Sequence, residues 1–305
     1  MNIIRILSKI YNLIFPNRLK IKKLIDENAK LKKQNTYLKQ HCDITKMKVA
    51  DGCLRKYQLD NLEYVYTYTN FLKNELNISC FLESGSCLGA IRHNGYIPWD
   101  DDMDIGLLHS DYNKLIEYAK KNYIWYDTYE IKENAFFYYD EIIKNHKNEY
   151  VAILSPFCLH IYKGESIKDA LNAEFFPWDY VKETVTENEY LEYIKNIRLE
   201  ISKLNSWTEI FDFYKKIEKN NIFSDSPTSK IAPGIGHWDF ARHNTRGLLD
   251  TNSIFPCKLA KFENYKMFIP NDPEKYLLNT YGDYMSFPED VGISRHWQEM
   301  DNVIY

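Results

Sequence analysis

The sequence lacks the hallmarks of several common protein classes. None of its six cysteines forms a Cys-x-x-Cys pair, so neither a zinc site nor a disulfide framework is predicted for a chain of 305 residues. It has no excess of basic residues, because its formal net charge is −4, and this argues against a general nucleic-acid binder. No apolar run is long enough to cross a membrane, and no secretory cleavage site follows the first apolar residues. A reducing cytoplasmic compartment is expected.

One short run of the chain carries four carboxylates within five positions, namely Asp100, Asp101, Asp102 and Asp104. A folded enzyme keeps such a cluster mainly where a divalent cation neutralises it. From Asp102 onward acidic and apolar residues alternate, which predicts a strand with Asp102 and Asp104 on one face, roughly 6.5 Å apart. Two such carboxylates suit Mg²⁺ or Mn²⁺ beside substrate phosphates. The same cluster also fits a helix cap or a solvated acidic turn.

A glycine turn precedes the acidic run. Residues 81–95 are predicted to form a short apolar strand, a turn at Gly85 and a helix of about two turns. Gly85 permits a backbone shape that other residues resist. Ser86 is predicted to cap the helix and leave backbone N–H groups available to a phosphate. A Gly-Ser turn alone is weak evidence for a phosphate site. The order strand, Gly-Ser turn, short helix and acidic strand is stronger evidence.

This order of strand, Gly-Ser turn, short helix and acidic strand resembles the nucleotidyltransferase superfamily. Residues 83–105 are similar to the signature of the LicD family of bacterial phosphocholine transferases, to which the fukutin-type ribitol-phosphate transferases are distantly related. Residues 174–181 resemble a second block of that family, and a looser match extends over 262–288. The family usually has Asp where this chain has Glu174, a longer side chain of the same charge.

The resemblance implies an enzyme that transfers a phospho-alcohol from a CDP-activated donor, most simply CDP-choline, to a hydroxyl of a glycan precursor, and releases CMP. The precursor would belong to lipopolysaccharide, capsule or teichoic acid. The resemblance assigns Asp102 and Asp104 to one or two Mg²⁺ or Mn²⁺ ions, with Glu174 as a third ligand or as the base. The residues it assigns to nucleotide or substrate binding are Glu83, Gly85, Ser86, Arg92, His93, Asp100, Asp101 and Asp179. Two alternatives stay open: a nucleotidyltransferase that makes a CDP-alcohol from CTP, and a non-catalytic coiled-coil scaffold.

The first 45 residues are predicted to differ in kind from the catalytic part. Residues 1–16 form a basic amphipathic pattern, which suits the surface of an anionic membrane and also fits docking on the catalytic domain. A heptad across 19–45 predicts a short coiled coil and a homodimer, although a solvated single helix fits it as well. Its core positions are Ile21, Leu24, Asn28, Leu31, Asn35 and Leu38. The expected location is the inner face of a bacterial cytoplasmic membrane, peripherally bound.

Residues 54–305 predict a mixed α/β fold, a nucleotidyltransferase-like catalytic domain with added helices. Helices are predicted at 54–76, 111–122, 186–204 and 206–220, strands at 124–131, 135–144 and 149–162, and a loop at 227–236.

Overall fold

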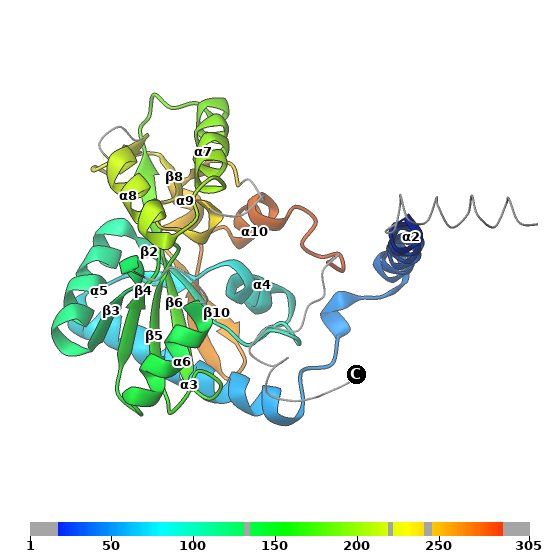
Figure 1. The fold of residues 1–305 in the computed structure, drawn as a ribbon, viewed down its shortest axis with the longest axis horizontal. Helices are drawn as coiled ribbons and strands as arrows, with labels where there is room; N and C mark the ends of the chain where they lie inside the picture. The colour runs from blue at the N-terminus through cyan, green and yellow to red at the C-terminus, as the bar shows by residue number, and fades with distance from the viewer. Residues whose placement is uncertain (1–17, 131–134, 219–221, 241–245, 289–305) are drawn as a thin grey trace, which may run out of the picture. The chain divides into compact units, whose positions relative to one another are not determined.

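The computed structural model describes residues 18–130, 135–218, 222–240 and 246–288 (Figure 1). The chain divides into two compact units, Met1–Lys46 with Met285–Val291 and Met47–Tyr284 with Gly292–Tyr305. The amphipathic helix predicted over 1–16 lies outside the described residues. None of the described helices has a stretch both long and apolar enough to span a bilayer.

In the smaller unit, helix α2 runs from Arg18 to His41 and is followed by a 3-10 turn, η1 (Ile44–Lys46). The helix predicted from the heptad is therefore present, whereas its pairing into a coiled coil stays a prediction. Leu24 and Leu31 of the heptad are 54% and 62% exposed in the single chain. Asn35 donates a side-chain hydrogen bond to the Pro288 carbonyl at 2.8 Å.

A nine-stranded mixed sheet forms the centre of the larger unit, counted over the described residues. Its main order is β1 (Cys80–Leu82), β2 (Asp104–Leu108), β6 (Leu171–Val181), β5 (Leu159–Lys163), β4 (Val151–Leu154) and β3 (Ile124–Asp127). Strand β6 also pairs with β7 (Phe223–Ser224) and β8 (Lys230–Pro233), and β8 pairs with β9 (Leu249–Asp250). The pairs β2–β6 and β3–β4 are parallel and the others are antiparallel. The predicted mixed α/β class is confirmed.

Helices surround this sheet, and a separate hairpin of β10 (Lys258–Phe262) and β11 (Tyr265–Ile269) follows it (Figure 1). The helices are α3 (Gly52–Leu76), α4 (Ser84–Arg92), α5 (His109–Asn122), α6 (Ala135–Asn145), α7 (Glu187–Ile201), α8 (Trp207–Ile217), α9 (Thr251–Ile254) and α10 (Pro273–Tyr281). Short 3-10 turns lie at η2 (Thr128–Glu130) and η4 (Trp238–Phe240). The four predicted helices correspond to α3, α5, α7 and α8, with small differences at their ends.

The main core lies between α3 and the sheet. Leu62, Val65 and Leu72 recur at helical spacing along α3 and are fully buried. They belong to the same apolar cluster as Phe175 and Trp178 of β6. A second apolar cluster joins α7 and α8 to the far end of β6, beyond the main sheet in Figure 1. Strand β6 is therefore fixed along its length by two cores, which makes it a rigid support for side chains.

Three local predictions were wrong. Residues 135–144 form α6 and not a strand, because Tyr139, Ile142 and Ile143 are buried at helical spacing against β4 and β5. The strand predicted over 149–162 is split, since the Ser155 hydroxyl accepts backbone N–H bonds from two of the next three residues and closes a turn. The loop predicted over 227–236 contains β8. Alternating aromatic residues fit either helix or strand locally, so packing decides between them.

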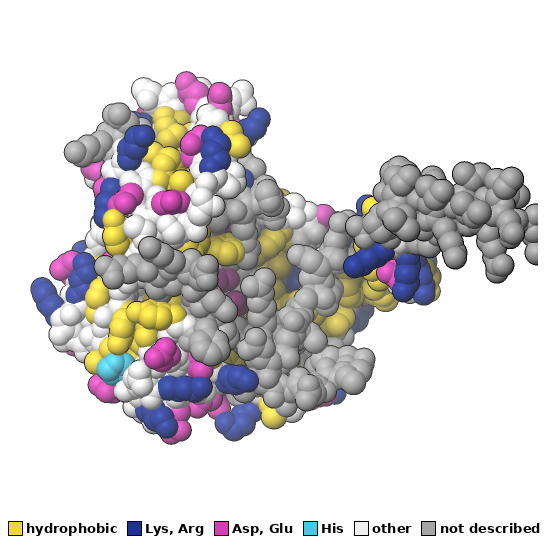
Figure 2. Space-filling model, in the orientation of Figure 1, with side chains coloured by type: hydrophobic (Ala, Val, Ile, Leu, Met, Phe, Trp, Pro, Cys, Tyr) yellow, Lys and Arg dark blue, Asp and Glu magenta, His cyan; other side chains and the backbone are white. Residues whose placement is uncertain are grey.

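The surface of the larger unit carries charges of both signs. In Figure 2, Lys and Arg side chains are interspersed with Asp and Glu over the described part of the face in view. This distribution agrees with the formal net charge of −4, and it differs from the basic stripe typical of nucleic-acid binders.

Candidate active site

The acidic run meets the sheet where β2 begins, between β1 and β6. The Glu83 N–H donates to the Asp104 carbonyl at 2.9 Å, and the Glu174 N–H donates to the Met103 carbonyl at 3.1 Å. Asp104 and Glu174 are partners in register on parallel strands, so their side chains leave the same face of the sheet. Met103 is fully buried, as the alternating pattern predicts. The strand itself begins at Asp104, so Asp102 precedes it instead of lying within it.

Carboxylates converge beside the first turn of α4. Ligand oxygens of Asp100, Asp101 and Asp102 lie within 4.8 Å of one another. A Cβ atom at Gly85 would lie 3.0 Å from Asp100 Oδ2 and 3.7 Å from Asp104 Oδ2, so both carboxylates reach the same glycine. The Gly85 N–H donates to Asp104 Oδ2 at 3.3 Å. The absence of a side chain at position 85 therefore leaves room at the point where the carboxylates meet.

The charges of this acidic cluster oppose one another. Burial and then the neighbouring Asp101 raise the pKa of Asp100 to about 7. Burial, together with Asp100, Asp104 and Glu174, raises the pKa of Asp102 well above its ordinary value. Such carboxylates retain a proton near neutral pH until a cation replaces it. A donor set made only of carboxylate oxygens fits the hard cations Mg²⁺ and Mn²⁺.

The Gly-Ser turn is tied directly to the start of β2. The Ser86 hydroxyl accepts a hydrogen bond from the Asp104 N–H at 2.8 Å. Helix α4 begins at Ser84 with Glu83 as its N-cap, so Ser86 lies inside the helix. The prediction that Ser86 caps this helix was therefore wrong. Ser84 has a positive φ of 44°, which is uncommon for a residue with a side chain. Its N–H donates to the Tyr276 hydroxyl at 2.8 Å, which helps to hold this conformation.

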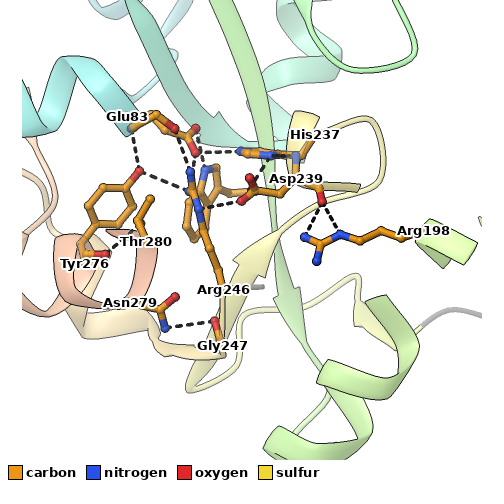
Figure 3. A network of polar contacts seen from close by, with 11 residues as sticks. Glu83, Arg198, His237, Asp239, Arg246, Gly247, Tyr276, Asn279 and Thr280 are labelled. Atoms are coloured by element: carbon orange, nitrogen blue, oxygen red, sulfur yellow. Dashed lines mark hydrogen bonds and ion pairs between the residues drawn. The ribbon is translucent and has the colours of Figure 1, made fainter. Parts of the chain in front are cut away.

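Glu83 lies at the centre of a buried polar network behind the turn (Figure 3). Its side chain is fully buried, with one oxygen 2.7 Å from His237 Nε2 and 2.9 Å from an Arg246 nitrogen. The other oxygen accepts the indole N–H of Trp178 at 2.9 Å. Burial raises the pKa of Glu83, but these neighbours, His237 first, outweigh it and leave the pKa lowered. Three side chains of the protein therefore contact this carboxylate, and these contacts hold the turn in place.

Arg246 extends the network to the turn itself. Its guanidinium donates to the Ser84 hydroxyl at 2.8 Å and contacts Asp239 at 2.6 Å (Figure 3). The Asp239 carbonyl in turn accepts two hydrogen bonds from Arg198 of α7. A chain of buried polar contacts therefore connects α7, the segment after β8 and the first residues of α4. It fixes the backbone of the turn.

Arg92 and His93, at the end of α4, contact each other. The Arg92 Nε lies 2.9 Å from His93 Nε2, and another of its nitrogens donates to the Tyr284 carbonyl at 2.7 Å. Burial lowers the pKa of Arg92 to about 10, opposed by Tyr281 and Asp100. Burial and then Arg92 lower the pKa of His93 to about 4, so the imidazole is neutral at pH 7. Arg92 is therefore a cation close enough to Asp100 to interact with it.

Asp179 lies apart from the acidic cluster. It is five residues beyond Glu174 on β6, a separation of roughly 16 Å in a regular strand, and the odd offset puts it on the other face. Its Oδ2 lies 2.8 Å from His109 Nδ1 of α5. The burial of His109 lowers its pKa, but the bond to Asp179 raises it more, and the net pKa is raised. The structure thus pairs Asp179 with α5 and not with the carboxylates at the start of β2.

Glu174 has polar neighbours on its own sheet. Asn172 donates to Glu174 Oε1 at 3.1 Å, and His160 Nδ1 of β5 lies 3.4 Å from the same oxygen. Beyond His160 Nε2, at 3.1 Å, is the sulfur of Cys158. These contacts orient the Glu174 side chain, whose exposed fraction is 17%.

Sequence reasoning missed several residues of this region. Gln58 of α3 is fully buried and donates to the carbonyls of Ile97 and Asp100, which fixes the loop that carries the acids. Tyr57 is close enough to the cluster for Asp101 and Asp102, after burial, to raise its pKa. The one available signal was a polar residue at a position of α3 where the helical pattern is otherwise apolar.

Comparisons with known proteins identify a family over part of the chain. Residues 77–204 match the family described as LicD/FKTN/FKRP, nucleotidyltransferase domain. That range includes β1, the Gly-Ser turn, the acidic run and Glu174, and it ends after α7.

Individual relatives match over shorter stretches. The uncharacterized protein RP689 of Rickettsia prowazekii is 38% identical over 80 residues, 25% of this chain and 30% of that protein. The uncharacterized protein RT0683 of Rickettsia typhi is 36% identical over 80 residues, 25% of this chain and 26% of that protein. The lipopolysaccharide cholinephosphotransferase LicD of Haemophilus influenzae is 39% identical over 64 residues, 21% of this chain and 24% of that protein. Each match spans less than a third of the relative. Residues 77–204 of this chain therefore belong to the LicD family.

Proposed function

We propose that this protein transfers a phospho-alcohol from a CDP-activated donor to a hydroxyl of a cell-surface glycan precursor and releases CMP. Phosphocholine carried by CDP-choline is the simplest donor, since a relative in Haemophilus influenzae is a lipopolysaccharide cholinephosphotransferase. The observation that carries the proposal is the convergence of Asp100 and Asp104 at the side-chain-free position of Gly85, with an oxygen of Asp102 within 4.8 Å of one of Asp100.

The acidic cluster supplies a cation site suited to a diphosphate. Asp102, Asp104 and Glu174 would hold Mg²⁺ or Mn²⁺, which when bound neutralises negative charge on the phosphates. Without a cation, the carboxylates would repel the negatively charged diphosphate. They also repel one another, which together with burial raises the pKa of Asp102. The cluster is therefore built to work with a bound cation.

The chain's own side chains divide the remaining work. The network around Glu83 fixes the first turn of α4, so the turn does not have to reorganise when a phosphate arrives. The acceptor oxygen forms a bond to the phosphorus that carries the alcohol, and the bond from that phosphorus to the CMP oxygen breaks. Glu174, oriented by Asn172, takes the proton of the acceptor hydroxyl when it does not serve as a ligand.

The test is a pair of incubations of the full chain with Mg²⁺. One contains labelled CDP-choline with a glycan acceptor extract, and the other contains CTP with phosphocholine. The proposal expects CMP release and a labelled glycan in the first incubation only. Asp104→Asn should abolish the transfer, whereas Asp225→Asn, at an exposed position, should not.

A second candidate is the synthesis of a CDP-alcohol from CTP. The description of the matched family as a nucleotidyltransferase domain favours it, and it needs the same carboxylates. Here the phospho-alcohol attacks the α-phosphate of CTP and pyrophosphate leaves. Release of pyrophosphate in the second incubation, without CMP in the first, would establish this candidate and reject the transferase.

A further inference from the structure

Cys158, His160 and Glu174 form a second set of metal-ligating side chains beside the acidic cluster. One ligand atom from each lies within 4.8 Å of the other two. The Cys158 sulfur lies 3.1 Å from His160 Nε2, and His160 Nδ1 lies 3.4 Å from Glu174 Oε1. Cys158 is buried and the exposed side-chain fractions of the other two are only 13% and 17%. The set is thus compact and largely shielded from solvent.

The sheet holds these residues in fixed register. His160 of β5 is the partner of Glu174 on β6, and Glu174 is the partner of Asp104 on β2. Asp104, Glu174 and His160 therefore form one row across three neighbouring strands. Cys158 comes two residues before His160, and its N–H donates to the Ser155 hydroxyl at 3.1 Å, which fixes the turn before β5. Since rigid elements carry the ligands, little reorganisation is needed to bind an ion.

We propose that Cys158, His160 and Glu174 bind a transition-metal ion of the Zn²⁺ class. Thiolate, imidazole and carboxylate are the three ligand types that Zn²⁺ prefers, and a hard cation such as Mg²⁺ avoids the first two. In a tetrahedral zinc site the ligand atoms are roughly 3.5 Å apart, as follows from the usual bond lengths. The 3.1 Å between the Cys158 sulfur and His160 Nε2 is close to that value, whereas Glu174 Oε1 lies 3.4 Å from the other ring nitrogen, so the Glu174 side chain, and not the backbone, must shift to share an ion with Nε2. Three protein ligands leave a fourth position open.

Neighbouring side chains contact the proposed ligands, as supporting residues do in most metal sites. Asn172 donates to Glu174 Oε1 at 3.1 Å, and the Tyr162 hydroxyl lies 3.4 Å from His160 Nδ1. Such contacts orient ligands and raise metal affinity. Binding replaces the thiol proton of Cys158, which passes to solvent.

Glu174 belongs to both sets of ligands. An ion held by Cys158 and His160 draws this carboxylate away from Asp102 and Asp104, so a zinc-class ion would inhibit the transferase. This consequence rests on the proposed function, whereas binding of the ion does not.

The experiment uses Co²⁺ as a spectroscopic probe on the full chain after chelator treatment and exchange into metal-free buffer. A cysteine thiolate bound to Co²⁺ gives an intense charge-transfer absorption in the near ultraviolet, which carboxylate and imidazole ligands do not give. The variants are Cys158→Ser, His160→Gln and, as the matched control, Cys53→Ser at an exposed cysteine of α3. Thermal unfolding of each variant checks that it folds.

The proposal expects the absorption at one equivalent of Co²⁺ in the wild type and in Cys53→Ser, and its loss in Cys158→Ser. In His160→Gln the affinity for Co²⁺ should fall at least about tenfold, the lower end of the loss seen when only a supporting residue is removed. An absorption that persists in Cys158→Ser, or that is missing from the wild type, would overturn the site. If Cys158→Ser does not fold, His160→Gln decides.

A second readout separates this proposal from the proposed function. Asp102→Asn should lose transfer but keep the cobalt–thiolate absorption. Zn²⁺ should inhibit transfer by the wild type and by Cys53→Ser, and at least tenfold more Zn²⁺ should be needed with Cys158→Ser. If the protein has no transferase activity at all, the absorption is still expected.

Discussion

The substitution Asp102→Asn should stabilise the cation-free protein and at the same time abolish its activity. Replacing a partly buried acid usually costs stability. Here, however, Asp102 lies among Asp100, Asp104 and Glu174, which together with burial raise its pKa well above the ordinary value. Asparagine keeps the shape and removes one of the opposing charges. Functional sites are often destabilised in this way, because the arrangement serves a bound ligand and not the free protein.

The size of the effect follows from the distances and the pKa values. Two charged carboxylates whose oxygens lie within 4.8 Å of each other repel by at least about 3 kcal/mol at an effective dielectric constant near 20. The pKa of Asp100, raised to about 7 by burial first and by Asp101 next, shows that the folded cluster disfavours the charged form. A proton held within the cluster already relieves part of this repulsion. We therefore expect Asp102→Asn to raise the free energy of unfolding by about 1–3 kcal/mol at pH 8.

The gain should depend on pH with a defined sign. The folded state binds the Asp100 proton more tightly than the unfolded state does, because the folded pKa is the higher one. The wild type therefore loses stability as the pH rises from about 4 through the folded pKa of Asp100, and Asp102, whose pKa is raised as well, adds to the loss. The advantage of Asp102→Asn should be small at pH 4 and largest at pH 8.

The measurement is urea unfolding in EDTA at pH 4, 6 and 8, with Asp225→Asn at an exposed position as the control. Adding Mg²⁺ should raise the stability of the wild type more than that of the variant, since a ligand stabilises only the state that binds it. A variant less stable than the wild type at pH 8, or a difference that does not change with pH, would refute the electrostatic reasoning. Full transfer activity in Asp102→Asn would refute the cation assignment.

Three further substitutions test other parts of the larger unit. Arg246→Met removes the partner of two buried carboxylates and should cost about 3–5 kcal/mol in urea unfolding, so a cost below about 1 kcal/mol would contradict the network. His109→Gln breaks the bond to Asp179. Because the folded pKa of His109 is raised, the stability that this bond contributes is complete below about pH 6.5 and is lost as the pH rises through the folded pKa. The variant should therefore lose about 1–2 kcal/mol of unfolding free energy at pH 6 and less at pH 9. Gly89→Ala would stabilise an ordinary helix, but its Cβ would lie 2.4 Å from the Gly95 carbonyl oxygen, so thermal unfolding should show a loss of about 1–3 kcal/mol.

The parts of the site that could be predicted from the sequence are those formed by residues close together in the chain. The glycine turn, the acidic alternation and the long helix before them are contiguous patterns, and each was found within a few residues of its predicted position. A place for Glu174 on a neighbouring strand was expected only through family resemblance, and its register with Asp104 was not predicted, since nothing in either segment fixes which residues pair. Their local chemistry is clear, whereas their pairing depends on the sheet as a whole.

The contacts that were missed join residues far apart in the sequence. Arg246 contacts Glu83 across 163 positions, and Gln58 reaches the carbonyl of Asp100 across 42. No local pattern marks a buried arginine or glutamine as the partner of a particular turn. His160 was different. Cys158 and His160 are two positions apart within the strand predicted over 149–162, so a common face could have been inferred. The strand predicted over 135–144 failed for the opposite reason, since its local pattern fits both helix and strand.

The distribution of charge explains why the turn and the acidic cluster behave differently although they are adjacent. Glu83 is fully buried, yet its pKa is lowered, because His237, Arg246 and Trp178 surround it. The pKa of Asp102, in the acidic cluster, is instead raised by burial and by other acids. The first arrangement is satisfied within the folded chain and makes the turn rigid. The second gains most from a positive ligand, so a cation bound there is held against a backbone that the Glu83 network has already fixed.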